Sequence, residues 1–258
     1  MKTKILISLT LLLLSLSWPA VSQEAPQKPI FYPTGNEATL VGTISLKGSI
    51  PKTPLIDMTA DPACVKLNRK PEIESLKVDQ GRLKNAFVYV KGEAIDAFRF
   101  EIPDAEVTLQ HRACNFEPHV LAVRASQPLR LFNADPTIHN FHPTPKLNAE
   151  WNYSFAAGSP ASTRTFDKAE ILIPFRDNQH PWEKAYVAVM DHPFFAITDS
   201  LGRFEIKGLP AGTYKLVIWH EMFDEQELEV TIVPGEIRNA DFTFDIEKVA
   251  HGKKYWWP

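Results

Sequence analysis

Short apolar runs broken by turn-forming residues constrain the fold of this chain more than any other feature. Proline is abundant, with 21 residues, and glycine contributes 11. Apolar and polar residues alternate over a few positions at a time, as they do from Leu40 to Leu46, whereas apolar residues at helical spacing are scarce. Short strands separated by turns predict an all-β protein.

Several ranges fit strands of this kind. The first runs from Thr39 to Ile50 and ends before Pro51, with Leu40 and Ile44 among the residues on its apolar face. The range from Leu83 to Val90 is apolar on both faces, which is typical of a central strand. Further strands are expected at 118–123, 129–131, 171–173, 184–190, 227–233 and 240–246.

The N-terminal residues 1–22 predict a secretory signal peptide. Lys2 and Lys4 precede an apolar run that ends at Leu14, and the small residues Ala20 and Ser22 provide a cleavage site. The run is too short to span a bilayer. We therefore expect a periplasmic or secreted protein with a flexible lead-in at 23–37 and no transmembrane segment after signal removal.

The charge of the exported chain excludes some partners. Removing residues 1–22 takes away two lysines and no acids, so the formal charge changes from -3 to -5. A mildly acidic surface without a basic block argues against nucleic acid and anionic membranes as partners. Hydrolase, phosphate-loop and dinucleotide motifs are absent from the sequence.

Two segments each place a histidine after a predicted strand. The strand at 129–131 leads into Asn133, Asp135 and then His139, and the strand at 171–173 leads into the loop 177–183, which contains His180. We expect the two imidazoles to converge at one end of a β-sandwich.

This pattern resembles plastocyanin-like and amicyanin-like cupredoxins, in which an Asn-x-Asp-x-x-x-His segment precedes Cys-x-x-His-x-x-Met. The family binds copper through His, Cys, His and Met. His139 and His180 match the two histidines, whereas Asp177 and Glu183 stand at the positions of the cysteine and the methionine. The resemblance therefore implies a cupredoxin-like Greek-key β-sandwich with a degenerate site, whose metal ligands are His139, Asp177, His180 and Glu183.

The replaced ligands change the chemistry that such a site supports. A blue-copper electron carrier needs a thiolate on the metal, and Asp177 cannot supply one. Two imidazoles with carboxylates suit copper(II) or zinc, and an iron(II) site if positions stay open. The alternative is a fold without metal, in which Asp177 and Glu183 pair with Arg176 or Lys184.

Three further residues are expected around the ligands. Asn140 follows the first ligand and, as the resemblance implies, ties the two ligand loops together. His142 is expected on the rim, where it relays protons or contacts a partner. His119 begins a strand and is either satisfied by backbone groups or orients a ligand from outside the metal's own shell.

Cys64 and Cys114 are the only cysteines, and an even pair in an exported chain predicts a disulfide. Closing a loop of this length is worth about 4 kcal/mol in the chain-entropy model. Cys114 as a copper ligand is the weaker reading, because the residues after it lack the Cys-x-x-His register.

A second signature follows the loop 177–183. Asp199, Gly202 and Phe204, followed by Pro210 and Tyr214, resemble the Thr-Asp-x-x-Gly-x-Phe and Leu-Pro-x-Gly-x-Tyr segments of carboxypeptidase regulatory-like, transthyretin-like domains. Residues 199–202 fit a tight turn between strands. We therefore predict a cupredoxin-like domain at 38–186, a small transthyretin-like β-sandwich at 187–247 and a C-terminal tail at 248–258.

The sequence thus favours an exported, non-catalytic binding protein that holds copper(II) or zinc and meets an unidentified protein partner in the cell envelope. One alternative is a metal-free structural or interaction module. Another is a metal-dependent oxidase or dioxygenase, for which His220 and His251 offer candidate ligands but no motif at the spacing of intradiol dioxygenases.

Overall fold

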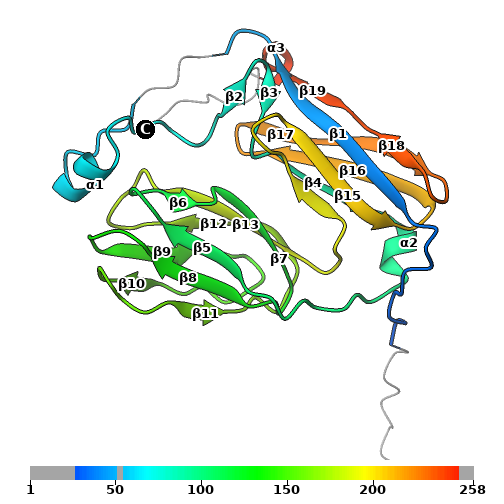
Figure 1. Ribbon diagram of the computed structural model, residues 1–258, viewed down its shortest axis with the longest axis horizontal. Helices are drawn as coiled ribbons and strands as arrows, with labels where there is room; N and C mark the ends of the chain where they lie inside the picture. Colours follow the sequence, from blue (N-terminus) through cyan, green and yellow to red (C-terminus); the bar gives the residue numbers. More distant parts are fainter. Residues whose placement is uncertain (1–26, 51–54, 250–258) are drawn as a thin grey trace, which may run out of the picture.

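The computed structural model describes residues 27–50 and 55–249, arranged as two β-sandwiches (Figure 1). The predicted signal peptide, His251 and most of the predicted C-terminal tail lie outside these residues. The all-β prediction is confirmed. The helices are α1 (Pro62–Leu67), α2 (Glu93–Asp96) and α3 (Ile246–Val249). No helix in the described ranges is long and apolar enough to cross a membrane.

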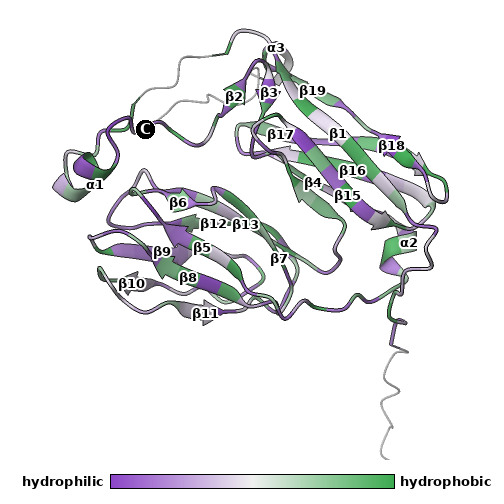
Figure 2. Ribbon diagram, viewed as in Figure 1, coloured by the Kyte–Doolittle hydropathy of each residue, from purple (hydrophilic) through white to green (hydrophobic). Residues whose placement is uncertain are grey.

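The first sandwich combines strands from both ends of the described chain. Its strands are β1 (Ala38–Lys47), β2 (Val78–Asp79), β3 (Arg82–Leu83), β4 (Phe87–Lys91), β14 (Phe195–Ile197), β15 (Arg203–Leu209), β16 (Gly212–His220), β17 (Phe223–Ile232), β18 (Ile237–Asn239) and β19 (Phe242–Asp245). One sheet has the order β15-β1-β3-β2, with β18 and β19 also pairing with β1, and the other has the order β14-β4-β16-β17. Buried and more exposed residues alternate along β1, as do apolar and polar ones (Figure 2).

The second sandwich is continuous in sequence. Its strands are β5 (Val107–His111), β6 (Phe116–Glu117), β7 (Val120–Arg124), β8 (Leu129–Asn133), β9 (His139–Pro143), β10 (Tyr153–Phe155), β11 (Ser162–Arg164), β12 (Glu170–Arg176) and β13 (Lys184–Met190). One sheet has the order β10-β9-β12-β13-β7 and the other β11-β8-β5-β6. The pairs β5 with β8 and β7 with β13 are parallel, which a simple hairpin meander cannot produce.

Strand pairing divides the chain differently from the predicted boundary near residue 186. Strands β1 and β4, expected in the domain at 38–186, pair with β15 and β16 of the C-terminal part. The cupredoxin-like sandwich at 107–190 is therefore inserted between β4 and β14 of the other sandwich. The sequence signature could not reveal this arrangement, because it covers only the hairpins near residues 198–214.

The predicted turn at 199–202 connects the signature to β1. Gly202 has a φ of +68°, a region that glycine adopts without strain, and a Cβ there would lie 2.4 Å from the carbonyl oxygen of Ile44. The amide of Ile44 donates to the carbonyl oxygen of Gly202 at 2.7 Å. The turn therefore depends on β1 as its packing partner.

The two sandwiches share an apolar interface in addition to their own cores. Val88 and Val90 face the core of the first sandwich, while Phe87 and Tyr89 on the opposite face of β4 contact the second. Their partners there include Met190 on β13. Because this interface is buried, β13 is held against the first sandwich.

Candidate metal centre

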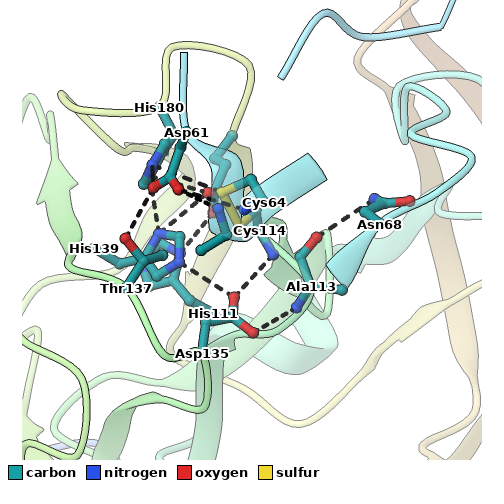
Figure 3. Close-up of a disulfide and its surroundings, with 12 residues drawn as sticks. Asp61, Cys64, Asn68, His111, Ala113, Cys114, Asp135, Thr137, His139 and His180 are labelled. Atoms are coloured by element: carbon teal, nitrogen blue, oxygen red, sulfur yellow. Dashed lines mark hydrogen bonds and ion pairs between the residues drawn. A yellow bond between two sulfur atoms is a disulfide. The ribbon is translucent and has the colours of Figure 1, made fainter. Parts of the chain in front are cut away.

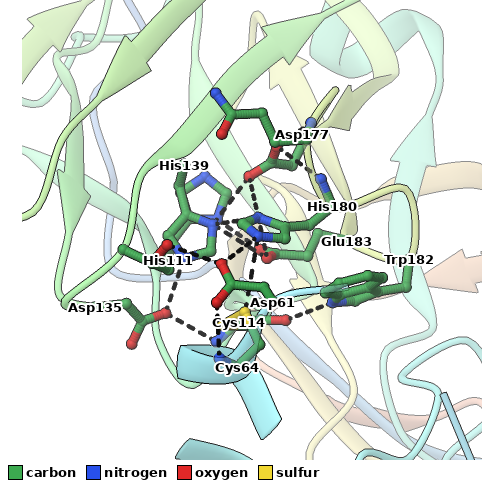
Figure 4. A network of polar contacts seen from close by, with 12 residues as sticks. Asp61, Cys64, His111, Cys114, Asp135, His139, Asp177, His180, Trp182 and Glu183 are labelled. Atoms are coloured by element: carbon green, nitrogen blue, oxygen red, sulfur yellow. Dashed lines mark hydrogen bonds and ion pairs between the residues drawn. A yellow bond between two sulfur atoms is a disulfide. The ribbon is translucent and has the colours of Figure 1, made fainter. Parts of the chain in front are cut away.

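The two histidine loops meet at one end of the second sandwich. His139 is the first residue of β9, and Asp177 follows the last residue of β12. Strands β9 and β12 are neighbours, with Arg176 paired to His142, so the loops that flank them start side by side. The loop from β12 to β13 then brings His180 back over the end of the sheet (Figure 4).

The four predicted ligands form one buried cluster. His139 Nδ1 lies 2.9 Å from Asp177 Oδ2, 3.1 Å from Glu183 Oε1 and 3.1 Å from His180 Nδ1. His180 Nδ1 lies 3.2 Å from Asp177 Oδ2 and 3.4 Å from Glu183 Oε1. None of these four residues is more than 3% exposed. The structure therefore brings together all four donors that the resemblance implied.

These distances fit donors around one cation. A tetrahedral ion with bonds of about 2.0–2.1 Å separates its donors by roughly 3.3–3.4 Å, and the separations here are 2.9–3.4 Å. Two imidazole nitrogens that lie 3.1 Å apart can share at most one proton. Glu183 Oε1 is buried and makes no hydrogen bond, although it lies near both nitrogens. A bound cation would therefore give this buried carboxylate oxygen the partner that it lacks.

Two further carboxylates face the outer nitrogens of the histidines. Asp61 Oδ2 lies 3.1 Å from His180 Nε2, and Asp135 Oδ2 lies 3.2 Å from His139 Nε2, the latter as an ion-pair contact without hydrogen-bond geometry (Figures 3 and 4). The amide of Cys114 donates to Asp135 at 2.8 Å. A carboxylate behind a metal-binding imidazole fixes the orientation of its ring and raises its basicity.

His111 supports Glu183 in a similar way. His111 Nδ1 lies 2.6 Å from Glu183 Oε2, and its ring stacks on that of His139 with centroids 4.3 Å apart. Burial lowers the pKa of His111 despite the neighbouring Glu183, so a neutral imidazole donates to the carboxylate. The sequence reading missed His111. The alternation of Val107, Leu109 and His111 along one strand would have indicated an inward-facing histidine.

Asp177 is anchored by the backbone of its own loop. Its carboxylate accepts hydrogen bonds from the amides of Gln179 at 2.7 Å, His180 at 3.1 Å and Asn140 at 3.0 Å. Burial opposes ionisation, but the histidines and these amides hold the pKa of Asp177 far below its usual range. Asp177 is therefore a fixed anion at the position where cupredoxins have a thiolate.

The remaining predicted residues differ in their distance from the centre. Asn140 links the two loops, since its side-chain oxygen accepts from the amide of Asn178 at 3.3 Å. His142 lies on the rim, where it contacts Asn178 and Glu150.

His119 does not contact the four donors in the described structure. Its contacts therefore do not support the prediction that it orients a metal ligand. Its Nε2 lies 2.9 Å from Glu221 Oε1. Tyr186 lies beside the His119 ring, and the side chains of His119 and Glu221 are buried between the sandwiches. His119 directly precedes β7, and its carbonyl oxygen accepts a hydrogen bond from the amide of Tyr186 on β13.

The predicted disulfide between Cys64 and Cys114 is confirmed, and both residues are fully buried. Figure 3 shows it beside the histidines. Cys64 Sγ lies 3.8 Å from His180 Nε2, and Trp182 Nε1 donates to the carbonyl oxygen of Cys114 at 3.1 Å. The sequence predicted the bond but not its position, because the residues before Cys64 carry no strand or motif that places them.

Comparison with known proteins finds a family match for the second of the two sequence resemblances. Residues 176–245 match the carboxypeptidase regulatory-like domain. This match begins in the last residue of β12 and lacks β1 and β4, which complete the first sandwich. No curated protein matches this chain.

Solved structures similar to this chain include cupredoxins and a copper-containing nitrite reductase. A copper-containing nitrite reductase from Thermus scotoductus SA-01 has 17% identity and a TM-score of 0.32, with 34% of this chain and 23% of the reductase chain covered. A purple cupredoxin from Nitrosopumilus maritimus has 14% identity and a TM-score of 0.29, with 33% and 99% covered. A copper(I) form of an amicyanin mutant has 20% identity and a TM-score of 0.30, with 35% and 87% covered.

Proposed function

We propose that this protein is an exported binding protein that holds one copper(II) or zinc ion through His139, Asp177, His180 and Glu183. The observation that supports this proposal is the spacing of four buried donor atoms, 2.9–3.4 Å for the pairs that involve an imidazole. Residues 1–22 and the buried disulfide support export, because disulfides persist in oxidising compartments. Its partner would be another protein of the cell envelope.

The donor set favours binding over turnover. Four protein ligands complete a tetrahedral shell, as in structural zinc sites, whereas catalytic sites keep one position for water or substrate. A bound dication would fix the two loops in place and would have no thiolate to tune it for electron transfer. This argument also favours a binding protein over the oxidase or dioxygenase alternative. His220, considered for that alternative, is buried elsewhere, with its Nδ1 accepting from the amide of Met222.

The charge of the cluster suits a divalent ion. Burial opposes protonation of His139, but Asp135, Asp177 and Glu183 raise its pKa to about 11. Burial also opposes protonation of His180, and its contacts with Asp177 and Asp61 raise its pKa. His139 is therefore protonated at neutral pH in the metal-free protein. A cation bound between the two imidazoles would take the place of the proton between their Nδ1 atoms.

Metal binding should therefore release about one proton per ion near pH 7, because the His139 imidazole must lose its proton before it can bind. The affinity should rise by roughly tenfold per pH unit in that range. Isothermal titration calorimetry with zinc in two buffers of different protonation enthalpy measures the released protons directly. A buffer-independent enthalpy would contradict the exchange of protons for metal.

The same pKa shifts predict opposite pH trends for the two forms. The raised pKa of His139 stabilises the metal-free fold below the ordinary histidine range, and this contribution is lost as the pH rises toward about 11. The lowered pKa of Asp177 contributes above the ordinary aspartate range and is lost as the pH falls. The metal-free protein should thus lose stability from pH 7 to 10, while the zinc-loaded protein should not.

Metal content and electron paramagnetic resonance test the proposed function. After loading and desalting, the protein should retain one ion per chain, and the copper(II) form should give an axial spectrum without an intense visible band. His180→Ala should lose the ion, whereas His142→Ala should keep it, because His142 lies on the rim. A wild-type protein that retains no metal would leave the metal-free module as the function.

That second candidate has one specific observation in its favour. Asp177 and Glu183 already have partners in the described structure, namely the imidazoles of His139, His180 and His111. They are not paired with Arg176 or Lys184, the partners expected from the sequence for a fold without metal. A protonated histidine pair could therefore hold the loops without metal, and the retention experiment separates the two functions.

A further inference from the structure

We propose that reduction of the Cys64–Cys114 disulfide opens a second, thiolate-bearing site beside the first, which takes Cu(I). This inference depends on the proposed function only in that both sites use His180. The divalent ion would face His180 Nδ1, whereas the thiolate site would face the opposite nitrogen, Nε2. The protein would then hold copper in either oxidation state, each with donors of the matching hardness.

The positions of the sulfur atoms support this site. Cys64 Sγ lies 3.8 Å from His180 Nε2. Donor atoms of Asp61, Cys64 and His180 all lie within 4.8 Å of one another, as do those of Cys114, Asp135 and His139 (Figure 3). The disulfide thus lies on the outer side of both imidazoles. Once separated, its two sulfurs would lie beside ring nitrogens whose other neighbours are the carboxylates of Asp61 and Asp135.

The chemistry of these donors selects a soft cation. Thiolates and imidazole favour Cu(I), whereas carboxylates and imidazole favour Cu(II) or zinc. A dithiol would supply two electrons and two protons, becoming a disulfide itself, while the Cys64–Cys114 bond breaks and each sulfur leaves as a thiol. Binding of Cu(I) would then displace the protons of the coordinating thiols.

The local packing allows the disulfide to open without unfolding of either sandwich. Cys64 and Cys114 belong to a small apolar cluster with Met58, separate from the two sandwich cores, and Ile56 and Trp182 pack against it. Helix α1 has only six residues. Segments with few buried apolar contacts open at a lower free energy than the whole domain. A reductant can therefore reach the sulfurs when α1 moves.

Transfer of Cu(I) from its coloured bicinchoninate complex tests the inference. The full chain is reduced with a phosphine under anaerobic conditions, freed of reductant and compared with the oxidised chain. The reduced chain should remove about one equivalent of Cu(I), and the oxidised chain should bind Cu(I) at least about tenfold more weakly, since only the reduced chain offers thiolates. A thiol assay should find both cysteines, while near-ultraviolet circular dichroism remains native.

Two controls assign the Cu(I) to the sulfurs. The double variant Cys64→Ser with Cys114→Ser should behave as the oxidised chain does. If that variant fails to fold, reduced wild-type protein alkylated with iodoacetamide takes its place. His180→Ala in the reduced chain should weaken Cu(I) binding, while His142→Ala should not. Equal Cu(I) uptake by the reduced, oxidised and alkylated chains would overturn the inference, as would thiols that appear only when the native spectrum is lost.

Zinc binding by the oxidised chain, measured in parallel, separates this inference from the proposed function. Zinc binding without a Cu(I) difference would refute the thiolate site alone. A Cu(I) difference without zinc binding would refute the carboxylate centre and leave the thiolate site in place.

Discussion

Replacing His139 with alanine should lower the free energy of unfolding of the metal-free protein by about 3–5 kcal/mol, the usual cost of breaking a buried ion pair from one side. His139 is fully buried and contacts three carboxylates, those of Asp135, Asp177 and Glu183. Its removal takes away the one cation that all three carboxylates contact. Urea denaturation of metal-free protein near pH 7 measures the change.

A matched variant isolates the effect of the buried cation. His142→Ala removes a histidine three positions along the same strand, but its partner Glu150 is exposed, so we expect a loss of at most about 1 kcal/mol. Zinc should stabilise wild-type protein and His142→Ala, and it should not restore His139→Ala. Equal and small losses for both variants would show that the carboxylates around residue 139 are protonated or hydrated rather than paired with the imidazole.

The strand pattern predicted that His139 and His180 meet at one end of a sandwich, and the resemblance to cupredoxins added Asp177 and Glu183 as candidate donors. Strands β8 and β12 end next to the loops with His139 and Asp177, and the register of β9 against β12 brings these loops together. The supporting residues could not be found in this way. Asp61 lies before a short helix in an irregular segment. Nothing in the sequence indicates that the disulfide places Asp61 beside His180.

The same limit applies to the fold. Local alternation predicted the strands, with boundaries shifted by a few residues, as for the first strand, which ends at Lys47 rather than at Ile50. Three of the four partners of β1 lie more than 150 residues away in sequence, namely β15, β18 and β19. Long-range pairing of this kind leaves no local pattern. The insertion of one sandwich into another therefore required the structure.

Replacing the carboxylate of Asp177 with a thiolate should give the chain the ligand that blue-copper proteins have and this chain lacks. Asp177→Cys places a sulfur near the position of the Asp177 carboxyl carbon, one bond from the Oδ2 atom that lies 2.9 Å from His139 Nδ1 and 3.2 Å from His180 Nδ1. The copper(II) form should then show an intense visible charge-transfer band that the wild-type copper form does not have. Absorption and electron paramagnetic resonance spectra of the two copper-loaded proteins measure the change.

Asp177→Ser is the matched control, because it has the same shape without a thiol. Both variants lose part of the carboxylate's hydrogen bonding to the amides of Gln179 and Asn140, so both should be destabilised by about 1–3 kcal/mol. Only the cysteine variant should acquire the band. Residue 177 would not be a ligand if the cysteine variant bound copper without the band while its introduced thiol stayed free to react. In that case His139 and His180 would have to hold the ion with Glu183 alone, which leaves an open position and favours the catalytic alternative over the binding protein.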